Sequence, residues 1–242
     1  MPAAADVRNK LIMITPILDR SFRDGSVLTR LLVADVRHIE HDEAWIAEAI
    51  GTLSAERRDR ALTYTFPRGR ALSVTAAQLL DMLIQPYGLR ESQMTYSIGE
   101  HGRPSFASCH AQHVPDIDDI LTRMDFSISH SGTRAAVALA VADVGDGQQI
   151  ITPRIGLDIQ MPTRSRQSLF RTVLAPDELR QMAALGHDEQ DRLFQRLWTH
   201  KEAYAKAIGT GLQHPYPSPP PETIMHEVDI DDYHLCIVIN PS

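Results

Sequence analysis

The sequence predicts an α+β fold built as two similar lobes, and two observations point to it. The order strand, helices, strands occurs twice along the 242 residues, and the two passes meet near residues 143–153. A chain of this length is also long enough to bury a core in each lobe. We therefore place an N-terminal lobe at residues 1–148, with residues 1–30 as an extra arm, and a C-terminal lobe at residues 149–242.

In the first half, apolar runs with β-branched residues predict strands, and apolar stripes at helical spacing predict helices. The expected elements are a strand over 31–37, helices over 41–50, from Leu53 and over 69–83, and strands over 95–98, from Phe126 and over 135–142. Ser54 is a candidate N-cap for the helix from Leu53. The acidic stretch 110–123 is longer than most connections, so we expect a surface loop there.

In the second half, the same two patterns predict a strand, three helices and a final strand. They are a strand over 154–160, helices over 169–174, 175–185 and 191–208, and a strand over 234–239. Pro176 suits the first turn of its helix, and Gly209-Thr-Gly211 ends the longest one.

Composition excludes several classes of protein. Hydrophobic residues make up 43% and charged residues 23% of the chain, as in soluble globular proteins. A net charge of -7 predicts no nucleic-acid partner, and no stretch is long enough to span a membrane. Cys109 and Cys236 match no metal-binding or disulfide pattern, which fits a reducing cytoplasm.

Asp158 and Gln160 lie two positions apart in an expected strand, so their side chains leave the same face. Two oxygen donors on one face suit Mg²⁺, which prefers oxygen ligands. The same spacing also occurs on the solvent face of a half-exposed strand. On spacing alone, this second interpretation is favoured.

Glu202 and Lys206 are four positions apart on the expected long helix and share a face, with Trp198 one turn earlier. Lys201 lies about 100° round the helix from Glu202, so one ligand could meet both side chains. A carboxylate beside ammonium groups can bind a metal and pair with phosphate. The alternative is an ordinary surface Glu–Lys pair, which is the more frequent case.

His130 lies among Ser129, Ser131 and Gly132, where hydroxyls, backbone N–H groups and an imidazole can be presented to an anion. A Ser–His nucleophile pair is a weaker idea, because the Gly-x-Ser-x-Gly turn is missing. A structural histidine in a turn is the plain alternative.

Five arginines fall within fourteen residues, opposed only by Glu56 and Asp59. They are Arg57, Arg58, Arg60, Arg68 and Arg70. Guanidinium groups suit phosphate, although such a run is usually a solvated helix face.

Together these segments resemble the 4′-phosphopantetheinyl transferases of the larger, surfactin-synthetase-activating type. The resemblance covers about Leu53 to Leu212. It is carried in order by Leu53-Ser-Ala-Glu-Arg-Arg, Arg70 before an Ala/Leu-rich helix, Gly102-Arg-Pro104, Phe126-Ser-Ile-Ser-His-Ser, Gly156-Leu-Asp-Ile, and Trp198-Thr-His-Lys-Glu-Ala with Lys206 and Gly209-Thr-Gly211. The Gly156 and Trp198 blocks at this separation are specific.

The resemblance implies two pseudo-symmetric lobes, each a small antiparallel sheet packed with helices, with coenzyme A in the cleft between them. It implies transfer of 4′-phosphopantetheine from coenzyme A to a serine of an apo acyl or peptidyl carrier protein, with release of 3′,5′-ADP. We expect a cytoplasmic, monomeric enzyme.

By the same resemblance, Asp158 and Glu202 would hold Mg²⁺, and Gln160, where the family often has Glu, would be a weaker third ligand. Glu202 would also be the base for the carrier serine, and Lys206 would neutralise or protonate the leaving phosphate. The other expected contacts to coenzyme A are Ser129, His130, Lys201, Arg57, Arg60, Arg70, Gly102, Arg103 and Pro104.

Two other functions remain open at this point. A non-catalytic module that binds coenzyme A or a carrier protein is the main alternative, with Gln160 as the sign of a weakened metal site. The intact Asp158, Glu202 and Lys206 argue against it. A metal-dependent phosphohydrolase would release product from coenzyme A without a carrier protein.

Overall fold

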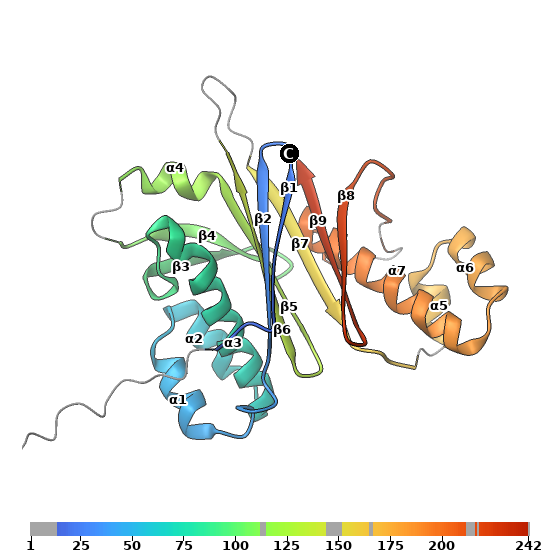
Figure 1. The fold of residues 1–242 in the computed structure, drawn as a ribbon, viewed down its shortest axis with the longest axis horizontal. Coiled ribbons are helices and arrows are strands. Elements are labelled where there is room, and N and C mark those ends of the chain that lie inside the picture. The colour runs from blue at the N-terminus through green and yellow to red at the C-terminus, as the bar shows by residue number, and fades with distance from the viewer. Residues whose placement is uncertain are drawn as a thin grey trace, which may run out of the picture.

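The computed structural model describes residues 14–111, 115–143, 152–164, 167–211, 216 and 218–241. Two lobes meet along their sheets, with helices α1–α3 and helices α5–α7 on opposite sides of the molecule (Figure 1). No helix in the described part of the chain is long and apolar enough to cross a membrane. The expected lobe boundary at residues 148 and 149 lies outside the described residues.

The N-terminal lobe has a four-stranded antiparallel sheet in the order β1-β2-β6-β5 and a separate hairpin, β3-β4. Its strands are β1 (Leu18–Asp24), β2 (Val27–Asp35), β3 (Met94–Ile98), β4 (Pro104–Cys109), β5 (Met124–Ser131) and β6 (Arg134–Ala142). Its helices are α1 (Glu43–Gly51), α2 (Ala55–Leu62), α3 (Pro67–Ile84) and α4 (Ile117–Thr122), with 3-10 turns at Gln85–Tyr87 and Glu91–Gln93.

Helix α3 forms the main contact between the N-terminal helices and their sheet. Pro67 occupies its first turn, where a missing N–H costs nothing. The predicted apolar stripe is buried, with Leu79 and Leu80 fully enclosed beside Phe126 and Leu139 of the sheet. Each such side chain stabilises the lobe by roughly 1.5–3 kcal/mol relative to exposure.

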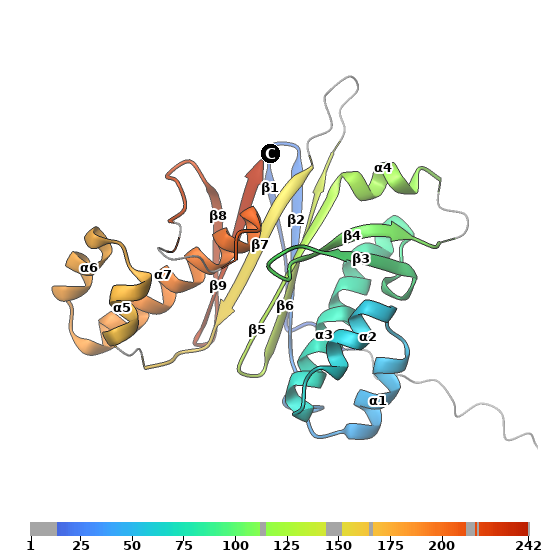
Figure 2. The ribbon, with the colours of Figure 1, turned by 180° about the vertical axis from the view of Figure 1, so that it is seen from behind.

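The C-terminal lobe has a three-stranded antiparallel sheet in the order β7-β9-β8. Its strands are β7 (Pro153–Gln160), β8 (Ile224–Ile230) and β9 (Tyr233–Pro241), and its helices are α5 (Gln167–Val173), α6 (Pro176–Ala183) and α7 (His187–Ile208). Helix α7 packs on β7 and β9 (Figure 2). The helix ends at Gly209, whose φ of 74° is left-handed.

The two lobes repeat one topology. When β1 is set aside, the first strand of each sheet pairs with the last, and the last pairs with the one before it, giving β2-β6-β5 and β7-β9-β8. Helices α3 and α7 follow the first strand of their lobes and are counterparts. The expected α+β fold of two similar lobes is confirmed, and β1 extends the N-terminal sheet alone.

Small side chains allow the two sheets to approach each other. Ala136, Ala138 and Ala140 are fully buried and share a cluster with Ile155 and Leu157 of β7. Alanine leaves room for the large residues of the facing strand, so the sheets pack directly.

A row of polar side chains then joins β5 to the edge of β7. The backbone N–H of Ile155 donates to Asp125 Oδ2 at 2.9 Å, and that of Leu157 donates to Ser127 Oγ at 2.9 Å. The backbone N–H of Met161 donates to the Ser131 hydroxyl at 3.0 Å. The alternating serines after Phe126 therefore satisfy the free edge of a strand from the other lobe.

Three strands and one helix differ from the expectations. Strands β1, β4 and β8 were not expected, because their sequences mix polar and apolar residues without a clear period. Part of the stretch expected to be a loop at 110–123 is helix α4, and residues 112–114 lie outside the described part.

Candidate active site

Strand β7 and helix α7 meet at Gly156. A Cβ atom at this position would lie 1.8 Å from the carbonyl oxygen of Ala203 and 2.5 Å from the backbone nitrogen of Ala207. Only glycine permits this approach of helix to strand. The contact brings Lys206 of α7 beside Asp158 of β7.

Asp158 is buried and bound by three side chains. Lys206 Nζ and Ser129 Oγ both donate to Asp158 Oδ1 at 2.7 Å, and Gln160 Nε2 donates to Oδ2 at 3.0 Å. Lys206 Nζ also donates to Ser129 Oγ at 3.1 Å and to the Leu157 carbonyl at 3.0 Å. The buried carboxylate thus has the ion pair and hydrogen bonds that burial requires.

Gln160 lies beside Asp158, as expected from their spacing. Asp158 is only 3% exposed, so this part of β7 is not a solvated strand face. The Gln160 amide is oriented with its N–H₂ toward the carboxylate. Rotation of the amide group by 180° would present its carbonyl oxygen at the same point.

Glu202 places a second carboxylate at this point. Partial burial raises the pKa of Glu202 to about 7, the negative charge of Asp158 contributes to the rise, and Lys206 opposes it. Within the described residues, no hydrogen bond reaches the Glu202 carboxylate. A carboxylate with this environment is suited to accept a proton or to share a cation with its neighbour.

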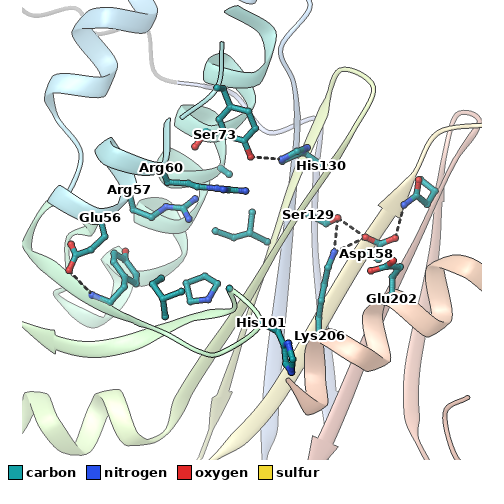
Figure 3. A pocket seen from close by; sticks show the side chains of 18 of the residues that line it. Glu56, Arg57, Arg60, Ser73, His101, Ser129, His130, Asp158, Glu202 and Lys206 are labelled. Carbon is teal, nitrogen blue, oxygen red and sulfur yellow. Dashed lines mark hydrogen bonds and ion pairs between the residues drawn. The ribbon is translucent and has the colours of Figure 1, made fainter. Parts of the chain in front are cut away.

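The opposite wall of the cleft carries two arginines from α2. Figure 3 shows Arg57 and Arg60 extending from this wall toward the cavity, across from Asp158, Glu202 and Lys206. Arg57 is buried, and its Nε has no hydrogen-bond partner among the described residues. Loss of water around it lowers the pKa of the Arg57 guanidinium, although arginine stays charged in proteins.

His130 lies between the two walls, at the end of β5. Its Nε2 is 3.2 Å from the hydroxyl of Tyr64, and the Arg60 guanidinium lies over the Tyr64 ring. Loss of solvent, followed by the positive charges of Lys206 and Arg60, lowers the pKa of His130 from its usual value. A neutral imidazole at pH 7 can then donate one hydrogen bond to an anion.

The turn between β3 and β4 closes a third side of the cleft. Gly102 has a φ of 78°, a left-handed conformation that glycine adopts without strain. Gly102, Pro104 and His101 line the cavity. Arg103 instead pairs with Asp125 and donates to the Ile155 carbonyl at 3.0 Å, so it ties this turn to the junction of the lobes.

These groups enclose a cleft of about 780 Å³ between the lobes, with an adjoining hollow of about 450 Å³. Both volumes lie within the range of roughly 300–1,000 Å³ that is usual for small-molecule sites. Among the expected site residues, the cleft is lined by Arg57, Arg60, Gly102, Pro104, Ser129, His130, Asp158, Gln160, Glu202 and Lys206.

Two expected contact residues lie elsewhere. Lys201 is 1% exposed, and its Nζ contacts Glu178 Oε2 at 3.1 Å and Ser218 Oγ at 2.6 Å, away from the cleft. The 100° offset from Glu202 therefore turns Lys201 into the core of the lobe rather than toward a shared ligand. Arg70 contacts the Thr65 carbonyl and does not line the cleft.

Several lining residues were not expected from the sequence. They include Glu56, Tyr64, Ser73, Ala76, Tyr96, Ile98, His101 and Ile128. Tyr64 and His101 lie close to arginine and glycine blocks that were singled out, so proximity in sequence is the only signal that could have suggested them. Glu56 of α2 and Ile128 of β5 likewise lie inside sequence blocks that were singled out, whereas Ser73, Ala76, Tyr96 and Ile98 depend on how helix α3 and the β3-β4 hairpin pack.

The carboxylates of the site fit a divalent cation. Asp158 and Glu202 are close enough for the charge of one to raise the pKa of the other. A cation between them would relieve this repulsion, and the Gln160 carbonyl could supply a further oxygen. Lys206 already neutralises part of the charge, so the residues suit a weakly held ion such as Mg²⁺.

Comparison with known proteins agrees with this geometry. Residues 154–232 match the model of the 4′-phosphopantetheinyl transferase superfamily. The chain is similar to the transferase HetI of Nostoc sp. (25% identity, 72% of this chain and 67% of the relative), and to Sfp of Bacillus subtilis (26% identity, 69% and 64%). It is also similar to AcpT of Salmonella typhi, with 30% identity over 66% of this chain and 71% of that protein.

The matches thus span about two thirds of these relatives' lengths. They include β7 and α7, the two elements that carry Asp158, Glu202 and Lys206. The chain belongs to the 4′-phosphopantetheinyl transferase superfamily.

Proposed function

We propose that this protein transfers 4′-phosphopantetheine from coenzyme A to a serine of an apo acyl or peptidyl carrier protein. The observation that carries the proposal is the meeting of Asp158, Glu202 and Lys206 at a cleft whose facing wall holds Arg57 and Arg60. A diphosphate needs cations on both sides, and its attacking hydroxyl needs a base.

In the proposed reaction, the serine Oγ attacks the pyrophosphate phosphorus that carries the pantetheine arm. The bond from that phosphorus to the 3′,5′-ADP oxygen breaks, and the serine proton passes to Glu202 directly or through water. Without metal the pKa of Glu202 is raised to about 7, and a cation would lower it, so Glu202 is ionised and able to accept the proton at neutral pH.

The other residues of the cleft offset charge. Lys206 stabilises the oxygen on which negative charge develops as 3′,5′-ADP leaves, while Arg57, Arg60 and a neutral His130 bind phosphate oxygens. Mg²⁺ held by Asp158 and Glu202, with Gln160 beside them, would neutralise charge on the pyrophosphate and lower the pKa of Glu202. Gly102 and Pro104 then border the adenine end of the cleft.

Arg103, Lys201 and Arg70 take different roles in this proposal. Arg103 and Lys201 hold the lobe junction and helix α7 through their ion pairs with Asp125 and Glu178. Arg70 lies one turn before the cleft-lining Ser73 on α3, so in this proposal it contacts a phosphate at the edge of the cleft.

Three further expectations belong to the same proposal. The lobes divide near residues 148 and 149, and the arm expected at residues 1–30 ends before β2, which begins at Val27 as a core strand of the first lobe. The enzyme acts as a monomer, because one chain supplies both walls of the cleft. It works in the cytoplasm, in keeping with its two free thiols, Cys109 and Cys236.

Intact-protein mass spectrometry of apo carrier proteins tests the proposal. With coenzyme A and Mg²⁺, a carrier should become heavier by one phosphopantetheine, and omission of Mg²⁺ should abolish the shift. Binding of coenzyme A by calorimetry with no mass shift in any carrier would favour the non-catalytic module. Product release without a carrier would indicate a phosphohydrolase.

A further inference from the structure

A second cluster of chemically active side chains lies on the other side of helix α7. His200 of α7, Glu227 of β8 and His234 of β9 each offer a nitrogen or oxygen atom, and these three atoms lie within 4.8 Å of one another. Residues two positions apart on a helix point about 200° apart. His200 and Glu202 therefore leave opposite sides of α7, and the cluster is separate from the cleft.

The register of the β8-β9 hairpin explains why these groups meet. Glu227 is paired with Cys236, and Asp229 with His234, so all four side chains share one face of the sheet. Cys236 packs against Ala203 of α7, which identifies this as the face that α7 covers. The hairpin thus presents a carboxylate and an imidazole directly to the helix.

Only one ring nitrogen of His234 makes a hydrogen bond: Nδ1 is bonded, and Nε2 has no hydrogen-bond partner among the described residues. His234 Nδ1 lies 2.6 Å from Asp229 Oδ1, an arrangement in which Nδ1 carries the proton. In the neutral ring, Nε2 then presents a lone pair, and Glu227 Oε2 faces it at 3.7 Å. The His234 ring is 8% exposed and the Glu227 side chain 36% exposed, so a cation reaching the cluster from the Glu227 side would satisfy the lone pair of the buried Nε2.

His200 shows the same feature. Its Nε2 lies 3.0 Å from Glu227 Oε1 without the alignment of a hydrogen bond. The Nε2 atoms of His200 and His234 are both buried with no hydrogen-bond partner among the described residues, and the His234 side chain is only 8% exposed. Both nitrogens thus face the Glu227 carboxylate, and an ion bound by all three side chains would replace these contacts.

The surrounding charges are compatible with a cation. Arg196, one turn before His200, donates to Glu227 Oε2 at 2.8 Å and lies 3.9 Å from Asp229. Arg196 therefore occupies Oε2 of Glu227 and leaves Oε1 for a ligand. Across the cluster, the two carboxylates of Glu227 and Asp229 outnumber the single guanidinium.

We propose that His200, Glu227 and His234 bind Zn²⁺, and that the ion fastens α7 to the β8-β9 hairpin. Two imidazoles and one carboxylate are a zinc donor set, whereas Mg²⁺ and Ca²⁺ prefer oxygen alone. Zinc bonds of about 2.0–2.1 Å require the three donors to draw closer than 4.8 Å, so binding calls for small rotations of the two imidazoles as well as of the Glu227 side chain. Asp229 orients His234, as carboxylates do for zinc-bound histidines.

Titration of the metal-stripped full-length protein with ZnCl₂, followed by calorimetry, tests the site. We expect one tightly bound Zn²⁺ per chain, an increase in melting temperature, and d–d absorption bands when Co²⁺ replaces Zn²⁺. His200→Gln and His234→Gln should each weaken Zn²⁺ binding at least tenfold, and Asp229→Asn should weaken it by roughly 10–100-fold.

Two control variants locate the ion. His226→Gln removes a histidine from the same hairpin that pairs with Asp24 outside the cluster, and it should leave Zn²⁺ affinity unchanged. Glu202→Gln alters the cleft and should also leave it unchanged. The proposal fails if folded wild-type protein takes up no Zn²⁺, or if His200→Gln, folded by circular dichroism, binds it as tightly as wild type.

Discussion

The two walls of the cleft differ in charge and in the way they are assembled. The N-terminal wall presents Arg57 and Arg60 from neighbouring turns of one short helix, so a local stretch of sequence produces its positive charge. The C-terminal wall brings together Asp158 and Glu202 from two elements that meet only in the folded lobe. The first wall is suited to recognise an anion, and the second to perform chemistry on it.

The largest effect should come from removing the base on the C-terminal wall. Glu202→Gln should lower the rate of carrier modification by about 10²–10⁴-fold, because a positioned base contributes this much. Wild-type kcat/KM should rise with pH through an apparent pKa at or below about 7, and the variant should lose this rise. Initial rates from mass spectrometry over a pH series measure both.

Glu222→Gln, in the exposed turn before β8, is the control for that experiment and should behave as wild type. If Glu202→Gln retained a rate within threefold of wild type, Glu202 would be excluded as the base.

A smaller loss of activity should follow from a substitution that displaces the C-terminal wall but keeps its catalytic side chains. Gly156→Ala forces α7 away from β7 and shifts Lys206 relative to Asp158, so activity should fall about 100-fold. The same overpacking should destabilise the fold by about 1–3 kcal/mol. Gly51→Ala, with no atom within 4 Å of the added Cβ, is the matched control. If the Gly156→Ala protein had the melting temperature and the activity of wild type, the position of helix α7 would not be critical.

The N-terminal wall should affect binding more than chemistry. Arg60→Ala should raise the KM for coenzyme A about 10–150-fold with little change in kcat, because a charged hydrogen bond to phosphate contributes about 1.5–3 kcal/mol. Arg58→Ala, on the exposed side of the same helix, should change neither constant. Equal effects of both substitutions would mean that the helix contributes only general positive charge.

The smallest effect is on folding stability, because the two neighbouring carboxylates of Asp158 and Glu202 destabilise the metal-free fold. Above pH 7, Glu202 is ionised in a half-buried place beside Asp158, and this cost disappears as pH falls from about 7 toward 4.5. Glu202→Gln should therefore raise the melting temperature of metal-free protein at pH 8 by a few degrees, corresponding to about 1–2 kcal/mol after allowance for solvent screening. At pH 5 the gain should be smaller.

Mg²⁺ provides the complementary measurement by scanning fluorimetry. It should stabilise wild-type protein at pH 8 and stabilise Glu202→Gln much less, because the amide no longer offers a second negative ligand. Equal Mg²⁺ shifts in both proteins would contradict a shared ion at Asp158 and Glu202.

Much of this molecule follows from local patterns in the sequence. The stripe of α3, the buried strands β6 and β7 and residues 191–208 of α7 were expected from their apolar patterns, whereas the first turn of α7 from His187 was not. The grouping of Asp158, Glu202 and Lys206 came from resemblance to a family, since no spacing rule connects residues so far apart. Strands β1, β4 and β8 are edge or hairpin strands with mixed polarity, and their sequences carry no such period.

Tertiary packing determined the direction in which the polar side chains point. Lys201 and Glu202 are neighbours in sequence, yet one is enclosed against Glu178 and the other faces the cleft, because the fit of α7 over Gly156 sets the rotation of the helix. The serines after Phe126 similarly bind the edge of β7 rather than a ligand, apart from Ser129 at Asp158. A helical or strand period specifies which residues share a face, but contacts between elements decide what that face meets.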